Sequence, residues 1–147
     1  MYDTILVPTD GSDGANAALR HAVDVARRYD ATLHVLYVVD DRMSPVDREM
    51  DRDEVLRLLE RADETPTAPA LERAREANVS ATDAIRVGVP HEVIREYVDE
   101  HDVDLVVMGT HGRTGLEHAL LGSTTERVVR TVDVPVLTVR LDPAESG

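Results

Sequence analysis

Glycines and a serine follow one of the most apolar stretches of the chain. The segment from Gly109 to Ser123 reads GTHGRTGLEHALLGS and comes directly after the run DLVVM. Glycines let backbone amides approach a phosphate closely, because no Cβ stands in the way. A helix predicted from Ser123 to about Thr131 would add free N–H groups and the positive end of its dipole, and the Ser123 hydroxyl can bind an anion and cap the helix. The pattern predicts a phosphate site.

A glycine cluster can also be a loop that only turns the chain, and for an isolated cluster this is the commoner case. Here an apolar strand precedes the glycines and a helix follows them, which is the context that a phosphate loop requires. The segment is not a Walker A loop, since it contains no lysine. It also lacks the G-x-G-x-x-G order of a dinucleotide fold, because Gly112 and Gly115 have no glycine two residues before them. Hydride transfer is therefore unsupported.

A second loop with polar residues follows the first apolar run. The sequence PTDGS at residues 8–12 comes after TILV, and Ser12 is a suitable N-cap for a helix that begins near Asp13. Asp10 can accept hydrogen bonds from a ribose or an adenine, and it can equally cap that helix. The residue itself leaves both interpretations open.

Six histidines raise the question of catalysis or metal binding. His111 and His118 lie in the glycine segment, but the sequence places no carboxylate or nucleophile beside either. The others are on separate predicted elements without metal-ligand spacing, namely His21, His34, His91 and His101. We therefore predict no catalytic residue and no metal site.

Apolar runs alternate with helical patterns, which is typical of βαβ units and a parallel sheet. The predicted strands span residues 4–8, 32–39, 81–87, 104–108 and 136–141, and the predicted helices span residues 13–29, 54–62, 70–77, 90–101 and 123–131. Pro66 and Pro69 predict a break before the helix at 70–77. Ligands of such sheets bind beyond the carboxyl ends of strands where the order reverses, so the loops after Val7 and Met108 are the expected binding elements.

The composition limits the possible partners and the environment. A net charge of -13 disfavours nucleic acids and anionic membranes. No cysteine, signal peptide or membrane span is found in the sequence, so we expect a cytoplasmic protein. All 16 basic residues are arginine, which together with the acidic excess predicts adaptation to high salt. A GC-rich genome is the alternative, although it explains the missing lysine better than the acidic excess.

The motifs together resemble the universal stress protein family over almost the whole chain. The family signature is Gly, two residues, Gly, nine residues, Gly and then Ser or Thr, and Gly109, Gly112, Gly122 and Ser123 match it without a gap. Further similar segments lie at residues 5–12, 38–40, 88–90, 107–109 and 135–139. The resemblance implies one α/β domain over 1–147, of the Rossmann-like, adenine nucleotide α-hydrolase-like type. Its five-stranded parallel sheet would have the order 3-2-1-4-5, with helices on both faces. Residues 40–69 match nothing assignable and form a variable acidic, proline-containing region.

Members with this signature bind ATP, and the resemblance implies a site residue by residue. Adenine and ribose would be bordered by Pro8, Thr9, Asp10 and Val38, the ribose by Met108 and Gly109, and the phosphates by Gly112, Gly122, Ser123 and Thr124. Arg113 is the only basic residue between Gly109 and Gly122. Phosphate binding would therefore depend on backbone amides, Ser123 and, as a further candidate, a Mg²⁺ ion.

The resemblance implies a stress-response regulator that binds ATP, ADP or AMP with little or no turnover. It would act as a homodimer through Val134 to Leu141 and have an unidentified regulatory protein partner. Two alternatives stay open. One is a slow ATP hydrolase or nucleotidyl-cleaving enzyme, since TDGSD loosely resembles the Ser-Gly-Gly-x-Asp-Ser loop of such pyrophosphatases. The other is a nucleotide-free dimeric interaction protein.

Overall fold

The computed structural model describes residues 1–40, 66–111 and 121–141. Its elements in chain order are β1 (Thr4–Thr9), α1 (Asp13–Tyr29), β2 (Thr32–Asp40), α3 (Ala68–Glu76), β3 (Ala81–Gly88), α4 (Pro90–Glu100), β4 (Leu105–Gly109), α5 (Ser123–Thr131) and β5 (Val136–Val139). Each predicted strand and helix within these ranges is confirmed, with ends shifted by at most two residues. The predicted helix at 54–62 and most of the variable region at 40–69 lie outside the described residues.

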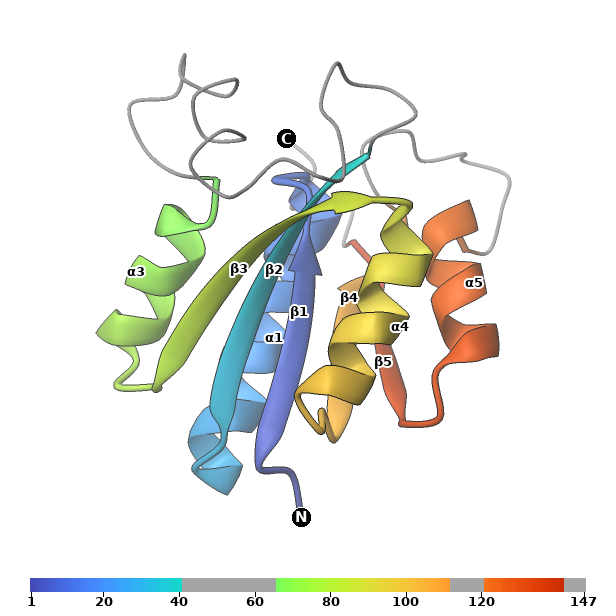
Figure 1. The fold of residues 1–147 in the computed structure, drawn as a ribbon. Coiled ribbons are helices and arrows are strands. Elements are labelled where there is room, and N and C mark those ends of the chain that lie inside the picture. Colours follow the sequence, from blue (N-terminus) through green and yellow to red (C-terminus); the bar gives the residue numbers. More distant parts are fainter. Residues whose placement is uncertain (41–65, 112–120, 142–147) are drawn as a thin grey trace.

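The strands form one parallel sheet in the order β3-β2-β1-β4-β5, as the family resemblance implied. Strands β2 and β3 are added in turn on one side of β1, and β4 and β5 are then added on its other side. The order therefore reverses between β1 and β4. In Figure 1, α1 lies behind the sheet and α4 and α5 lie in front of it, so both faces are covered. This explains why every residue of β4 is buried and why its sequence is a continuous apolar run.

Two apolar clusters hold the layers together. On the face of α1 and α3, the cluster includes Ile5, Val7, Leu33, Val35 and Val107, which are all fully buried. On the opposite face the buried members are Leu6, Leu36, Val93, Ile94, Tyr97, Val98, Val103, Val106, Met108 and Val128. Successive strand residues alternate between the two clusters because side chains of a strand point to opposite faces. Each fully buried aliphatic side chain contributes about 1.5–3 kcal/mol to folding.

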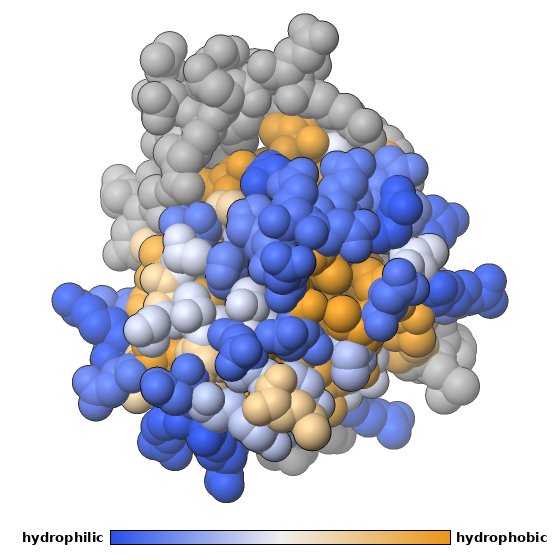
Figure 2. Space-filling model, turned by 60° about the horizontal axis from the view of Figure 1, so that its bottom comes forward, coloured by the Kyte–Doolittle hydropathy of each residue, from blue (hydrophilic) through white to orange (hydrophobic). Residues whose placement is uncertain are grey.

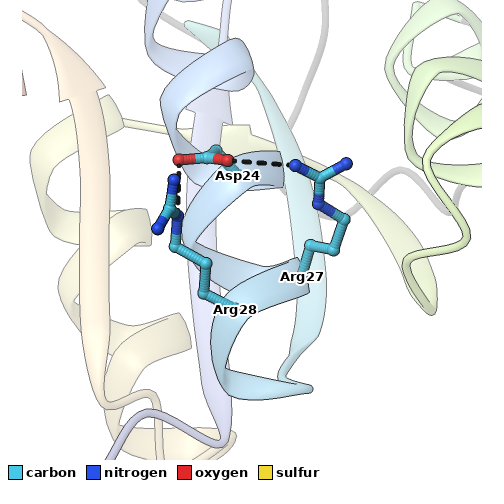
Figure 3. A network of polar contacts seen from close by, with 3 residues as sticks. All are labelled: Asp24, Arg27 and Arg28. Carbon is cyan, nitrogen blue, oxygen red and sulfur yellow. Dashed lines mark hydrogen bonds and ion pairs between the residues drawn. The ribbon is translucent and has the colours of Figure 1, made fainter.

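Helix α1 has clear signals at both ends. The Ser12 hydroxyl accepts a hydrogen bond from the backbone N–H of Ala15 at 3.2 Å, which confirms Ser12 as the N-cap. The helix ends at Tyr29, and its C-cap Asp30 has the left-handed conformation with φ of 54°. In its last turns, Asp24 accepts hydrogen bonds from Arg27 and Arg28 at 3.4 and 3.0 Å (Figure 3). These exposed pairs add only about 0.3–0.5 kcal/mol each.

The prediction that the break before this helix includes Ala68 and Pro69 is wrong. Helix α3 begins at Ala68 and contains Pro69 in its first turn, where a proline lacks only an N–H that the helix does not use. The preceding Thr67 is fully buried, and its hydroxyl donates to the Asp83 carboxylate of β3. This hydrogen bond ties the start of α3 to the edge of the sheet. No helix in the described part of the chain is long and apolar enough to cross a membrane.

Candidate functional site

The loop after β1 is shaped by hydrogen bonds between its own residues. The Asp10 carboxylate accepts a hydrogen bond from the N–H of Ser12 at 2.9 Å, and the N–H of Gly11 donates to the Thr9 hydroxyl at 3.2 Å. Gly11 has a φ of 79°, a conformation that favours glycine. One Asp10 oxygen therefore stabilises the turn that leads into α1, whereas the cap of the helix is Ser12 and not Asp10. Its role toward a ribose or an adenine stays a prediction.

The start of α5 at Ser123 is as predicted, but its capping residue is not. The N-cap is Gly122, and Ser123 is the first residue inside the helix, so the prediction that Ser123 caps α5 is wrong. The N–H of Gly122 donates to the carbonyl of Thr110 at 2.6 Å. The Ser123 side chain is exposed. A helix start capped by glycine keeps its first amides free of a side-chain cap, which suits an anion-binding position.

The end of β4 and the first turn of α1 are in close backbone contact. A Cβ placed on Gly109 would lie 2.8 Å from the carbonyl oxygen of Gly14, and a Cβ on Gly14 would lie 2.6 Å from the carbonyl oxygen of His111. Neither position has room for a side chain. Gly109 was expected as a site residue, whereas Gly14 was missed. The sequence does contain a signal for Gly14, because it lies inside a predicted helix. A glycine there costs about 1 kcal/mol relative to alanine, which indicates that close packing requires it.

The remaining described candidates lie near the carboxyl ends of neighbouring strands. Val38 packs against the apolar cluster that contains Met108. Pro8 follows Leu6 by two residues in β1 and therefore shares the same sheet face. β1 pairs with β2 through Thr9 but with β4 only at Ile5 and Leu6 within the described residues. The two strands thus stop pairing before their carboxyl ends, at the point where the strand order reverses. Gly112 and Arg113 lie outside the described residues.

Two of the histidines assigned to separate elements come together away from this edge of the sheet. His34 of β2 lies with its ring centroid 5.5 Å from that of His101, and its Nδ1 is 2.6 Å from the Tyr97 hydroxyl. The rings of Tyr97 and His101 are stacked at 3.9 Å. Burial lowers the pKa of His34, and the nearby His101 lowers it further. Burial also raises the pKa of Tyr97.

These groups do not form a metal centre. The described part of the chain contains no set of three or more His, Asp or Glu side chains that could hold a metal ion. In the glycine segment, His111 is half-buried and its Nδ1 lies 3.2 Å from the hydroxyl of the adjacent Thr110. His118 lies outside the described residues.

A parallel sheet in this order, with the first turn of α1 in close backbone contact with the end of β4, defines a doubly wound α/β protein. In sheets of this kind, ligands bind at the switch point. The model of the universal stress protein family matches residues 1–140. The universal stress protein MJ0531 of Methanocaldococcus jannaschii is 37% identical over 143 residues, covering 95% of this chain and 83% of that protein. The chain belongs to the universal stress protein family.

Solved structures agree with this assignment. The structure of MJ0577, another protein of Methanocaldococcus jannaschii, has a TM-score of 0.80 and 32% identity, covering 97% of this chain and 98% of that one. A universal stress protein solved in complex with cAMP has a TM-score of 0.69 and 27% identity, covering 96% and 98% of the two chains. The similarity thus extends over nearly the full length of each protein.

Proposed function

We propose that this chain binds an adenine nucleotide beyond the carboxyl ends of β1 and β4 and acts in the cytoplasm as a stress-response regulator. ATP is the first candidate, with ADP or AMP as alternatives, and we expect little or no turnover. The observation that carries the proposal is the backbone junction at the switch point of the sheet, where Gly14 contacts Gly109 and the N–H of Gly122 donates to the Thr110 carbonyl. The relative bound to cAMP supports an adenine nucleotide.

Each candidate residue has a place in this proposal. Pro8, Thr9, Asp10 and Val38 would border the adenine and ribose, and Met108 and Gly109 would border the ribose. The α5 start would hold the phosphates through Gly122, Ser123 and Thr124, with Gly112 and Arg113 as further phosphate contacts. We also propose that residues 1–147 form one domain.

The charge of the protein affects how the phosphates can be held. A nucleotide must bind against a formal net charge of -13, so fixed amide dipoles have to supply most of the attraction. A Mg²⁺ ion fits as a companion of the nucleotide and not as a resident of a protein cage, because the described residues offer no cluster of metal ligands. Mg²⁺ commonly binds through substrate phosphates and one or two carboxylates. Its chemistry there would be charge neutralisation.

The ligand can be identified directly. Mass spectrometry of the nucleotide released from purified, denatured protein should find ATP, ADP or AMP, and titration calorimetry should show binding of added ATP. Gly122→Val should weaken ATP binding at least about tenfold, because a branched side chain would stand where phosphate approaches the helix start. Ala68→Val adds bulk at the start of α3 and should leave binding unchanged.

The outcomes separate the alternatives. Protein that ignores adenine nucleotides would overturn the proposal and favour a nucleotide-free interaction protein. Steady conversion of ATP to AMP and pyrophosphate, followed by chromatography, would favour the cleaving enzyme. An ATP affinity of Gly122→Val equal to that of the natural protein would show that the nucleotide binds elsewhere.

We further propose that two copies pair through Val134 to Leu141 and that the dimer presents a surface to a regulatory protein. β5 is one of the two edge strands of the sheet, so one of its edges has no neighbouring strand among the described residues. Leu137 on this strand is 39% exposed. Light scattering should find a dimer for the natural protein and a monomer for Leu137→Arg. Tyr29→Arg replaces a similarly exposed apolar residue on α1 and should remain a dimer, whereas a dimeric Leu137→Arg would exclude this edge.

A further inference from the structure

One buried polar side chain at the junction is not among the proposed ligand contacts. Thr125 of α5 is only 3% exposed, and Thr67 is the other buried polar residue of the described chain. The Thr125 hydroxyl donates a hydrogen bond to the carbonyl of Gly109 at 2.9 Å. Buried hydroxyl groups almost always have a partner of this kind. This bond connects α5 to the last residue of β4.

The Gly109 carbonyl belongs to a residue that has little freedom to move. The backbone of Gly14 packs directly against Gly109, since the Gly14 carbonyl oxygen would lie 2.8 Å from a Cβ at position 109. The carbonyl oxygen of His111, two residues further on, would lie 2.6 Å from a Cβ at position 14. The first turn of α1 therefore holds the end of β4 in place, and β4 can serve as a fixed anchor for α5.

A second hydrogen bond fixes the other side of the helix start. The N–H of Gly122 donates to the carbonyl of Thr110 at 2.6 Å. Ser123 and Thr124 stand between Gly122 and Thr125, so the two residues are flanked on both sides by bonds to the end of β4. Loss of either hydrogen bond would allow the amides of Ser123 and Thr124 to shift relative to Met108 and Gly109.

We propose that Thr125 is a positioning residue, which sets the phosphate-binding amides of α5 at a fixed place relative to the ribose-binding end of β4. This inference rests on the proposed function. It adds that affinity for the phosphates depends on a buried side chain that does not touch the nucleotide. Recognition of the nucleoside part, by the loop after β1 and by Val38, does not depend on this bond.

The test compares a ligand with phosphates and one without them. Thr125→Val removes the donor while keeping the branched shape of the side chain. ATP affinity, measured by titration calorimetry, should fall roughly tenfold, while adenosine affinity, measured by competition, should stay within about twofold. Thr125→Ser keeps the hydroxyl and should retain the natural ratio of the two affinities. If Thr125→Val does not fold, Thr125→Ala removes the same donor without added bulk and carries the comparison.

Thr131 provides a matched control on the same helix. Its hydroxyl donates to the Arg127 carbonyl at 2.7 Å at an exposed position, so Thr131→Val loses a similar bond away from the junction and should leave both affinities unchanged. Parallel losses of ATP and adenosine affinity in Thr125→Val, or no loss of either, would overturn the positioning role alone, since the natural protein still binds ATP in that case. A natural protein that binds neither ligand would overturn the proposed function and this inference with it.

Discussion

At the scale of single residues, the candidate site contains backbone that has no room for side chains, at Gly14 and Gly109. Gly14 shows this best, because two opposing effects act at this position. Glycine inside a helix costs about 1 kcal/mol relative to alanine, so Gly14→Ala should stabilise α1 in isolation. In the folded protein, however, the new Cβ would lie 2.6 Å from the backbone carbonyl oxygen of His111, which cannot rotate away as a side chain can.

We predict that the contact outweighs the gain in helix propensity. Gly14→Ala should lower the free energy of unfolding by about 1–3 kcal/mol, the usual cost of overpacking, as measured by urea denaturation. Asn16→Ala on the exposed side of the same turn is the control and should be neutral or slightly stabilising. A Gly14→Ala protein that is more stable than the natural one would contradict the packing described for α1 and β4.

The sequence predicts only part of this junction. The glycine signature identifies Gly109 and Gly122, because their spacing and their position between a strand and a helix are visible without a structure. Gly14 and Thr125 could not be identified in this way. Their importance depends on which backbone atoms of β4 they meet, and that register is set by the packing of helices on the sheet, not by local sequence.

At the scale of elements, a polar cluster joins β2 and β3 to α4. His34 contacts Tyr97 and His101, and the Arg86 guanidinium lies over the Tyr97 ring at 5.4 Å. Arg86 also pairs with Glu100 at 3.4 Å. Burial raises the pKa of Tyr97, the positive charge of Arg86 lowers it, and the carboxylates of Asp83 and Glu100 raise it.

This cluster should make the protein less stable in acid. The pKa of His34 is lowered from its ordinary value of 6.5 by burial and then by His101. Between the lowered value and 6.5, the unfolded chain binds more protons than the folded one, so stability falls as the pH falls through this window. His34→Gln should remove that contribution, and its urea midpoint should decline less than that of the natural protein between pH 7.5 and pH 5.

A control must show that loss of a histidine does not by itself change the pH dependence of stability. His21→Gln changes an exposed histidine on α1 and should keep the pH dependence of the natural protein. Identical acid sensitivity in the natural protein and His34→Gln would show that the cluster does not resist protonation. Sequence periodicity placed β2 and α4 correctly but gave no sign of this contact, because His34 and His101 become neighbours only when α4 packs on the sheet face.

Most helices and strands could be predicted from the sequence, because their ends and apolar faces are marked by local residues. α1 was predicted with its cap and both ends, since Ser12 and the spacing of its alanines are local signals. The start of α3 was not, because Pro69 is compatible both with a break and with a first helical turn. The strand order came from the family resemblance, since alternation of strands and helices alone allows several orders.

At the scale of the whole molecule, the negative net charge is the feature that bears most on stability. Hydrophilic side chains cover much of the face shown in Figure 2, with apolar surface between them. All basic residues are arginine and the formal net charge is -13. Self-repulsion of such a surface opposes the compact state, and salt reduces it by shortening the Debye length from about 10 Å at 0.1 M to about 3 Å at 1 M.

We therefore propose that the protein is adapted to high salt, and we predict that its melting temperature rises as KCl is increased from about 0.1 M to above 1 M. A stabilisation of about 2 kcal/mol would raise the melting temperature by roughly 4–8 °C for a chain of this size. A variant that combines Glu96→Gln, Asp99→Asn and Asp102→Asn neutralises three exposed charges around the end of α4. It should melt higher than the natural protein in dilute buffer and gain less from KCl. Equal melting temperatures of the natural protein at low and molar salt would favour genomic base composition as the reason for the missing lysine.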